Sequence, residues 1–234
     1  MNLIYGKFIK RYKRFLVDVK TSDNQIITAH CTNSGSLKSC LVQDAPVVLS
    51  PVTNPNRKTK FTWEMIKIGD TWVGVNTMKA NEIAYQLLID KKLKDFEDLT
   101  VIKREVKFGN SRIDLYAENG RDKFFIEVKN VTYRHGDYAL FPDAKTIRGQ
   151  KHLIELMSAI DKGYKAAMFF IIQRTDTKIF APAWNIDPQY ATLLQQAHDK
   201  GVKIYPIQIK ISPQGWQLNK ILPFKLEKFN IQDI

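Results

Sequence analysis

The sequence predicts a two-domain α+β protein, in which a small β-barrel is followed by a mixed sheet flanked by helices. Two observations support this prediction. Residues 3–77 form a succession of short apolar and alternating runs, separated by turn-forming pieces and without a helical period. From Ala80 onward, apolar residues recur at spacings of three and four, and helical and strand patterns then alternate. We therefore place the domains at residues 1–79 and 80–234.

The N-terminal domain is expected to consist of short strands. They are predicted at residues 3–9, 12–20, 25–31, 46–51, 61–68 and 71–77. Turn-rich pieces such as Thr21-Ser22-Asp23-Asn24 and Gly69-Asp70 separate them. Strands of this length and number are typical of a small closed barrel. The version that we favour is an OB-like fold, whose barrel binds oligonucleotides across one face.

Cationic and aromatic residues alternate in two segments of this domain, residues 11–15 and 57–63. The cations assigned to nucleic-acid binding are Arg11, Lys13, Arg14, Arg57, Lys58 and Lys60. The rings beside them are Tyr12, Phe15, Phe61 and Trp63. A basic groove follows the phosphates of a strand while exposed rings stack on its bases. The cations are therefore interpreted as a phosphate-binding surface, whereas the rings could equally fill the barrel.

The chain is strongly basic, with a formal net charge of +12 and an isoelectric point near 9.5. The charge is densest in residues 1–79, which hold 12 Lys and Arg against 5 Asp and Glu, a net charge of +7. Such a balance indicates a polyanionic partner. We expect DNA rather than a membrane surface, because no strongly amphipathic basic helix is evident. We expect no small-molecule cofactor.

The cysteine content and the apolar runs indicate where the protein resides. Cys31 and Cys40 lack the close spacing of a structural zinc site and are expected to be free thiols. The apolar stretch at the N-terminus is too short for a signal peptide, and the longest apolar run, residues 166–172, is too short to span a membrane. These features predict a protein of the reducing cytoplasm.

The C-terminal domain begins with a predicted helix and continues with strands. The helix carries the apolar stripe Ala80, Ile83, Ala84, Leu87 and Leu88. Strands are predicted at residues 101–108, 111–117 and 123–131, a second helix at about 144–161 and a further strand at 165–173. An amphipathic stretch that starts near Tyr190 and a strand at 202–209 follow. The expected architecture is a mixed central sheet with helices on its faces.

The strand at 123–131 combines an apolar run with two charged residues, Glu127 and Lys129. Side chains alternate along a strand, so these two share a face. Asp114 stands between apolar neighbours in the preceding strand, and the Asn119-Gly120 pair between the strands is a strong hairpin signal. Hairpin pairing would bring Asp114 and Glu127 together. Two close carboxylates repel unless a cation lies between them, which favours a Mg2+ site, with Mn2+ as an alternative.

The spacing of Asp114, Glu127 and Lys129 resembles the signature of the PD-(D/E)XK nucleases, although Ile113 stands where that signature has proline. The order helix, three strands, helix, strand is also that of the nuclease core. The resemblance implies a restriction-endonuclease-like domain that hydrolyses phosphodiesters with a metal ion. Asp114, Glu127 and the Val128 carbonyl would hold the metal. Lys129 would orient the attacking water or offset the charge of the transition state.

The same resemblance assigns further residues to the site. Glu82 on the first helix and Glu105 on the first strand compete for another acidic role, since many superfamily members use a helix carboxylate. Several members place a glutamine on the second helix facing the site, which predicts Gln150. Arg148 and Lys151 lie in the first turns of that helix and are assigned to nucleic-acid binding, although this surface could simply face solvent.

Motifs spread over nearly the whole chain carry a second resemblance. They lie at residues 11–16, 30–35, 75–77, 80–81, 111–114, 127–129, 141–144 and 148–152. Together they resemble the sugar fermentation stimulation protein A family, which implies an OB-like domain joined to a PD-(D/E)XK domain and DNA binding with little sequence preference. The function that we favour is a Mg2+-dependent DNA nuclease. The alternative is a non-catalytic regulator of sugar (maltose) metabolism genes on a nuclease scaffold. The form of the nucleic acid, endonuclease or exonuclease action, and assembly as a homodimer stay open.

Replacing Lys13, Arg14, Arg57 and Lys58 together with alanine should weaken DNA binding for all sequences alike and flatten its dependence on salt. Fewer counterions would be released on binding, so the slope of log affinity against log salt should decrease by about 0.9 for each phosphate that the protein no longer neutralises. Binding titrations at several salt concentrations measure both effects. Losses that depend on sequence would indicate base readout, and an unchanged slope would exclude this surface from the DNA path.

Overall fold

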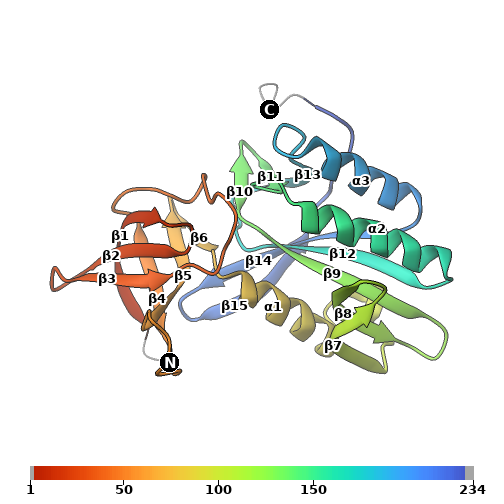
Figure 1. The fold of residues 1–234 in the computed structure, drawn as a ribbon, viewed down its shortest axis with the longest axis horizontal. Helices are drawn as coiled ribbons and strands as arrows, with labels where there is room; N and C mark the ends of the chain where they lie inside the picture. The colour runs from red at the N-terminus through yellow and green to blue at the C-terminus, as the bar shows by residue number, and fades with distance from the viewer. Residues whose placement is uncertain (1–2, 230–234) are drawn as a thin grey trace.

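The computed structural model describes residues 3–229 and places a β-barrel beside a larger α/β domain (Figure 1). The barrel is built from β1 (Ile4–Tyr12), β2 (Leu16–Thr21), β3 (Ile26–His30), β4 (Pro46–Pro51), β5 (Phe61–Ile68) and β6 (Thr71–Gly74). These strands follow the order β3-β2-β1-β4-β5-β6. β3 also pairs with β5 through His30 and Thr62, and this pairing closes the predicted barrel.

The interior of the barrel is filled by one face of each strand. Val17 and Val19 on β2 alternate with more exposed neighbours and are fully buried. Trp63 is also fully buried, and its ring stacks on Phe8 with the centroids 5.7 Å apart. Among the rings whose role the sequence left open, Trp63 therefore fills the barrel, while Phe15 is exposed on its surface.

The second domain is built on a six-stranded mixed sheet. Its strands are β7 (Val101–Phe108), β8 (Ser111–Glu118), β9 (Lys123–Val131), β12 (Lys165–Ile172), β14 (Lys203–Ser212) and β15 (Gly215–Ile221). They lie in the order β15-β14-β12-β9-β8-β7. The neighbours β7, β8 and β9 are antiparallel, whereas β9, β12 and β14 run parallel. The sheet thus combines a meander with a parallel core.

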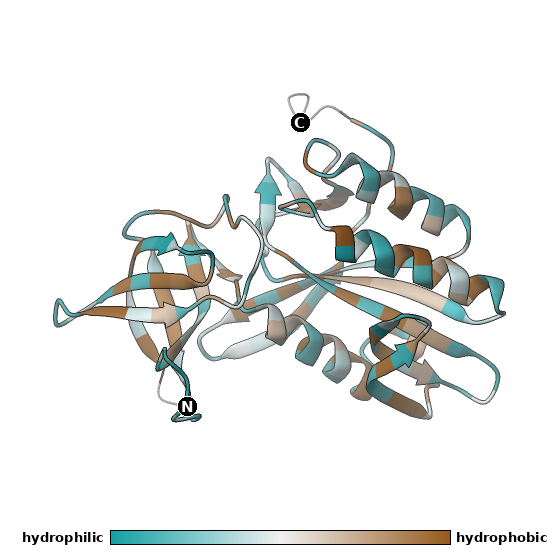
Figure 2. Ribbon diagram, viewed as in Figure 1, coloured by the Kyte–Doolittle hydropathy of each residue, from teal (hydrophilic) through white to brown (hydrophobic). Residues whose placement is uncertain are grey.

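Helices cover both faces of this sheet (Figure 1). They are α1 (Thr77–Ile89), α2 (Ile147–Asp161) and α3 (Pro188–Asp199), with a short 3-10 helix at Lys94–Phe96. α1 packs its apolar stripe on one face, in a core that includes Ile126 and Val128 of β9. α2 and α3 share the core on the opposite face through Leu153 and Leu194. Figure 2 shows hydrophobic and hydrophilic bands on these helices, as expected for helices with one buried face.

The start of α1 lies before its apolar stripe. Asn76 is the N-cap, and its side chain accepts a hydrogen bond from the Met78 N–H at 3.1 Å. β6 correspondingly ends at Gly74 rather than at the predicted residue 77. The predicted boundary between residues 79 and 80 therefore falls within the first turn of α1.

A small three-stranded sheet has no counterpart in the sequence-based prediction. It contains β10 (Tyr133–His135), β11 (Tyr138–Phe141) and β13 (Ile179–Pro182) in that order. β11 and β13 pair in parallel, although α2 and β12 separate them in the sequence. Strands this short do not show a two-residue period, and pairing between distant segments leaves no local signal. β15 likewise occupies the tail, where no element was expected.

The two domains approach each other closely near Gly74 and near the segment from Gly35 to Leu37. The Gly74 N–H donates to the Gln173 carbonyl at 2.9 Å, and the Leu37 N–H donates to Asp143 Oδ2 at 2.9 Å. A Cβ at Gly74 would lie 2.4 Å from Gln173 Oε1 and 2.9 Å from Gln173 Cβ. A Cβ at Gly35 would lie 2.0 Å from Asp143 Oδ1. A Cβ at Gly74 would therefore overlap the Gln173 side chain as far as its Cβ, and a Cβ at Gly35 would displace the Asp143 carboxylate.

Cys31 and Cys40 belong to the buried core of the barrel, and neither forms a disulfide. The prediction of two free thiols is confirmed. Within residues 3–229, no helix combines the length and the apolar character needed to cross a bilayer.

Gly74→Ala should lower the free energy of unfolding by about 1–3 kcal/mol, because the added methyl group overpacks the contact with Gln173. Urea denaturation followed by circular dichroism measures this loss. Gly120→Ala is the matched control, since a Cβ at Gly120 would meet no atom within 4 Å and should change stability by less than about 0.5 kcal/mol. Equal stability of the two variants would contradict the close approach of the domains.

Candidate active site

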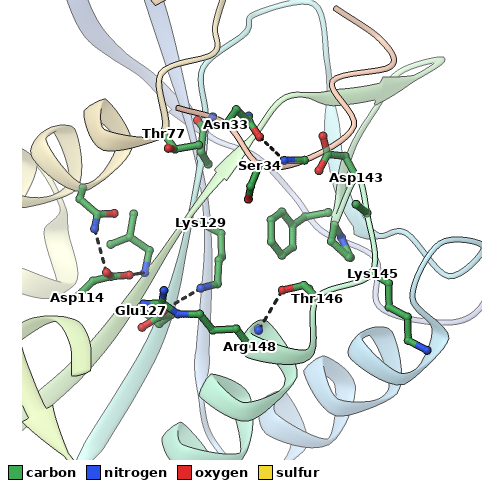
Figure 3. A pocket seen from close by; sticks show the side chains of 18 of the residues that line it. Asn33, Ser34, Thr77, Asp114, Glu127, Lys129, Asp143, Lys145, Thr146 and Arg148 are labelled. Carbon is green, nitrogen blue, oxygen red and sulfur yellow. Dashed lines mark hydrogen bonds and ion pairs between the residues drawn. The ribbon is translucent and has the colours of Figure 1, made fainter. Parts of the chain in front are cut away.

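A cavity of about 560 Å³ lies where the barrel meets the second domain. Its walls come from residues 33–35 of the barrel loop (residues 33–36), the start of α1, the strands β8 and β9, and the segment 141–149 that leads into α2. Figure 3 shows Asp114, Glu127 and Lys129 on the sheet side of this cavity, with Ser34 of the barrel loop across from them. The site is therefore built by both domains.

Asp114 and Glu127 come together as the hairpin pattern predicts. β8 and β9 pair in an antiparallel ladder as far as Leu115 and Ile126. Beyond this pair the ladder ends, and the carboxylate of Asp114 accepts the Val128 N–H at 2.8 Å instead. Because Asp114 replaces the missing ladder partner of Val128, the carboxylates of Asp114 and Glu127 lie on the same wall of the cavity (Figure 3).

The environment of Asp114 favours its neutral form. Burial is the main cause that raises the pKa of Asp114, to about 6, and the negative charge of Glu127 raises it further. Lys129 and the hydrogen bonds from Val128 and Asn81 act in the opposite direction. Asn81, on α1, donates to Asp114 Oδ1 at 2.9 Å. A cation near this carboxylate would relieve the electrostatic cost of its ionisation.

Glu127 is ionised although its side chain is only 1 % exposed. Its Oε1 accepts from Lys129 Nζ at 2.5 Å and also contacts His152 Nδ1. Burial alone would raise the pKa of Glu127, but the charge of Lys129 and the contact with His152 outweigh burial and lower the pKa to about 2. Glu127 and Lys129 share a face of β9, as the strand alternation predicts.

His152 lies between Arg148 and Glu127. The Arg148 Nε–H donates to His152 Nε2 at 3.4 Å. Nδ1 on the other side of the ring contacts Glu127 Oε1, and because an ionised carboxylate only accepts hydrogen bonds, Nδ1 is the donor. Arg148 and His152 are four residues apart on α2, so one face of the helix carries both. His152 was not among the predicted site residues, and its spacing from Arg148 is the signal that could have identified it.

The oxygen donors in the cavity fit a hard divalent cation. Glu127 Oε2 is buried and has no hydrogen-bond partner within the described part of the chain. Such an oxygen is costly unless a cation or donor satisfies it. Asp114 adds a second carboxylate, and Val128, whose carbonyl is the third predicted ligand, also lines the cavity. In residues 3–229 no three His, Cys, Asp or Glu side chains are grouped for metal binding, so waters or substrate oxygens would complete the coordination.

Three of the predicted acidic and amide residues lie away from the cavity. Gln150 is buried, and its Nε2 donates to the two carboxylate oxygens of Asp187 at 2.9 and 3.1 Å. Glu82 forms an ion pair with Lys79 at 2.8 Å on an exposed part of α1. Glu105 is exposed and has a φ of 56°. It lies between the pairs Arg104–Leu115 and Val106–Ile113, where the β7–β8 ladder omits one pair and keeps its register. The structure brings none of these three into the site.

The cations that line the cavity come from both domains. Arg14 and Arg148, both predicted to bind nucleic acid, lie there together with Lys145, which was not predicted. Arg11 does not. Its guanidinium donates at 2.7–3.1 Å to three carbonyl oxygens of the barrel loop. Arg11 therefore shapes the loop rather than presenting a free charge.

The other predicted cations lie outside the cavity. Lys60 Nζ donates to the Pro55 carbonyl at 3.1 Å, and Lys151 Nζ donates to the Asn110 carbonyl at 2.9 Å. The remaining members of the set are Lys13, Arg57 and Lys58, in the turn after β1 and the connection between β4 and β5. Lys13, Arg57 and Lys58 therefore belong to the surface of the barrel.

A small closed barrel joined to a mixed sheet with a carboxylate pair and a lysine is the architecture of an OB domain linked to an endonuclease-like domain. The sequence agrees with this class. Residues 9–75 match the SfsA N-terminal OB domain, and residues 78–215 match the sugar fermentation stimulation protein RE domain. The chain belongs to the sugar fermentation stimulation protein (SfsA) family, so both the predicted family and the predicted two-domain fold are confirmed.

Relatives match nearly the whole chain. The sugar fermentation stimulation protein homolog of Geotalea uraniireducens is 44 % identical over 214 residues, which cover 91 % of this chain and 93 % of the relative. The homolog of Geotalea daltonii is 41 % identical over 222 residues, 94 % and 96 % of the two chains. The structure of Pyrococcus furiosus SfsA in complex with Ca2+ superposes with a TM-score of 0.89 at 26 % identity and covers 96 % of each chain.

Asp114→Asn should stabilise the metal-free protein at pH 8 by up to about 3 kcal/mol, because a shift of about 2 pKa units corresponds to that free energy. The folded-state pKa of Asp114 is about 6, above the unfolded value. Wild-type stability should therefore fall as the pH rises from about 4 to about 6, and the two proteins should become equally stable below about pH 4.

Urea unfolding in chelator across this pH range measures the difference. Asp70→Asn removes an exposed carboxylate and should change stability by less than about 0.5 kcal/mol at every pH. A stabilisation by Asp114→Asn that is equally large at pH 4 and pH 8 would contradict the raised pKa.

Proposed function

We propose that this protein is a metal-dependent nuclease that hydrolyses phosphodiesters of DNA with Mg2+, or with Mn2+, and with little sequence preference. The observation that carries the proposal is the cluster of Asp114, Glu127 and Lys129 at a cavity with cationic walls. Two carboxylate oxygens in the described residues are buried without a hydrogen-bond partner, Glu127 Oε2 and Glu155 Oε2, and of these two residues only Glu127 lines the cavity. The open oxygen of Glu127 therefore favours a metal site over a purely structural role.

Asp114 and Glu127 are the residues that would hold the metal, with the Val128 carbonyl as a third ligand. A bound divalent cation would polarise the scissile phosphate and lower the pKa of a water. The related SfsA of Pyrococcus furiosus forms a complex with Ca2+, another hard cation that binds oxygen ligands. This likeness supports a divalent cation in the family.

Lys129 and Arg148 supply the positive charge that the reaction requires. The Lys129 ammonium bonds to Glu127 and also lines the cavity, so it can offset negative charge that develops on the phosphate oxygens. Arg148 lines the cavity one turn before His152 and can bind a non-bridging phosphate oxygen. His152 and Lys129 both contact Oε1 of Glu127, and the other oxygen, Oε2, has no hydrogen-bond partner within the described residues.

The barrel would bind the nucleic-acid strand that enters the cavity. Arg14 lies 5.6 Å from the centre of the Phe15 ring, which stacks with the His30 ring at 6.2 Å. Arg14 also lines the cavity, so one cation connects this aromatic surface with the site. An exposed ring beside cations suits base stacking combined with phosphate contact. We place this activity in the cytoplasm, where Cys31 and Cys40 would stay reduced.

Asp114→Asn and Glu127→Gln should each weaken Mg2+ binding and reduce cleavage by about 100-fold or more, since each removes a negatively charged ligand. Lys129→Ala should retain metal binding and reduce cleavage by about 100-fold to 1,000-fold, as expected for a group that acts on the transition state. Calorimetric Mg2+ titration and cleavage of plasmid and oligonucleotide DNA, both with purified protein, measure the two effects.

Glu82→Gln is the matched control, because this helix carboxylate lies outside the cavity and should leave metal binding and cleavage unchanged. Catalysis is excluded if wild-type protein, free of contaminating nuclease, leaves single-stranded, duplex and branched DNA intact with Mg2+ and with Mn2+. The protein would then be a DNA-binding regulator on an endonuclease-like scaffold.

A further inference from the structure

Two apolar side chains at the cavity are unusually exposed. Met78 is 71 % exposed and Ile147 is 75 % exposed, and these are the most exposed large hydrophobic side chains in residues 3–229. Both line the cavity that contains Asp114 and Glu127. Isolated exposed apolar residues are ordinary on protein surfaces, but here the two extreme cases share one site.

The two side chains stand at the starts of different helices. Met78 is in the first turn of α1, where Asn76 caps the helix, and Ile147 is the first residue of α2, after the cap Thr146. Figure 3 shows their neighbours Thr77 and Thr146 on different sides of Lys129, and Figure 2 shows the start of α2 as hydrophobic. The capped ends fix these positions, so both side chains are held at the cavity.

Neither side chain contributes to the packing of its helix. The buried stripe of α1 begins at Ala80, and that of α2 consists of residues from Gly149 onward. Exposing an apolar side chain to water gains nothing in folding, so a ligand that covers these side chains would recover the hydrophobic free energy. The ligand must also suit the cations of the same cavity, Arg14 and Lys145.

A nucleic-acid strand meets both requirements, since it carries phosphates beside flat apolar base faces. In a continuous duplex these faces are covered by their stacked neighbours. Apolar side chains such as Met and Ile contact them only where bases are unstacked, as they do when proteins wedge such residues between base steps. Exposed Met78 and Ile147 beside cations therefore suit a nucleic acid with unstacked bases better than a continuous duplex.

We propose that Met78 and Ile147 contact the faces of unstacked bases, so that the site takes a single strand, or the frayed or branched end of a duplex, in preference to a continuous duplex. The inference rests on the proposed function, because it assumes that the strand enters the same cavity. It adds the form of the substrate, which the sequence left open.

Binding without metal tests the proposal separately from hydrolysis. The probes are a single strand, a blunt duplex and a forked duplex of equal length, each with one 2-aminopurine, whose fluorescence rises when it is unstacked. In chelator, wild-type protein should bind the single strand and the fork more tightly than the blunt duplex and should raise the fluorescence of the base at the fork. The double variant Met78→Ala, Ile147→Ala should reduce this preference by about 5-fold or more and lose the fluorescence rise.

Ile89→Ala together with Ile154→Ala is the matched control. These residues lie on the same two helices, are 46 % and 52 % exposed, and do not line the cavity. The control should behave like the wild type, and circular dichroism checks that both double variants are folded. The proposal is overturned if the test variant keeps the wild-type preference, or if the control loses it to the same extent.

Cleavage of the same probes with Mg2+ separates the two proposals. A fluorescence rise that depends on Met78 and Ile147, without any cleavage, would support the base contact and remove the hydrolytic function. Cleavage of the blunt duplex at the same rate as the fork, without a fluorescence rise, would overturn the base contact and leave the hydrolytic function intact.

Discussion

The burial of a charge at Glu127 is the constraint on which the site depends. An ionised carboxylate with 1 % exposure requires compensation, and Lys129 and His152 both act on one of its oxygens. Lys129 belongs to the same strand, but His152 comes from α2, so α2 has to pack on the sheet with a fixed rotation. That rotation also directs Gln150 to Asp187. The chemistry of the site and the packing of α2 therefore cannot vary independently.

The parts of the fold that were predictable have local signals. β4, β5, β7 and β9 coincide with their predicted ranges, because alternation and turn residues define a short strand without reference to the rest of the chain. The meeting of Asp114 and Glu127 was predictable for the same reason, since a hairpin turn fixes which residues of adjacent strands lie opposite. A resemblance to a nuclease signature then gave these residues a chemical role.

The parts that were not predictable depend on tertiary packing. Polar residues crowd the first turns of α2, and the sequence does not show which of them the sheet will meet, so Gln150 was assigned to the site and His152 was not. Arg11 is similar. Its sequence context is cationic and aromatic, whereas its acceptors are carbonyl oxygens of the barrel loop, which reach it only when β1 and that loop fold together.

The barrel loop is held on two sides: Arg11 of its own domain donates to the Gly35 carbonyl, and Leu37, the residue that follows the loop, donates to Asp143 of the other domain. It forms a wall of the cavity whose carboxylates lie on the far side. An OB barrel is usually regarded as a detachable module. Here its loop forms one wall of the cavity, so an excised second domain would keep Asp114 and Glu127 but expose them to bulk water. Exchange of barrels between relatives would have to preserve this loop together with its two anchors.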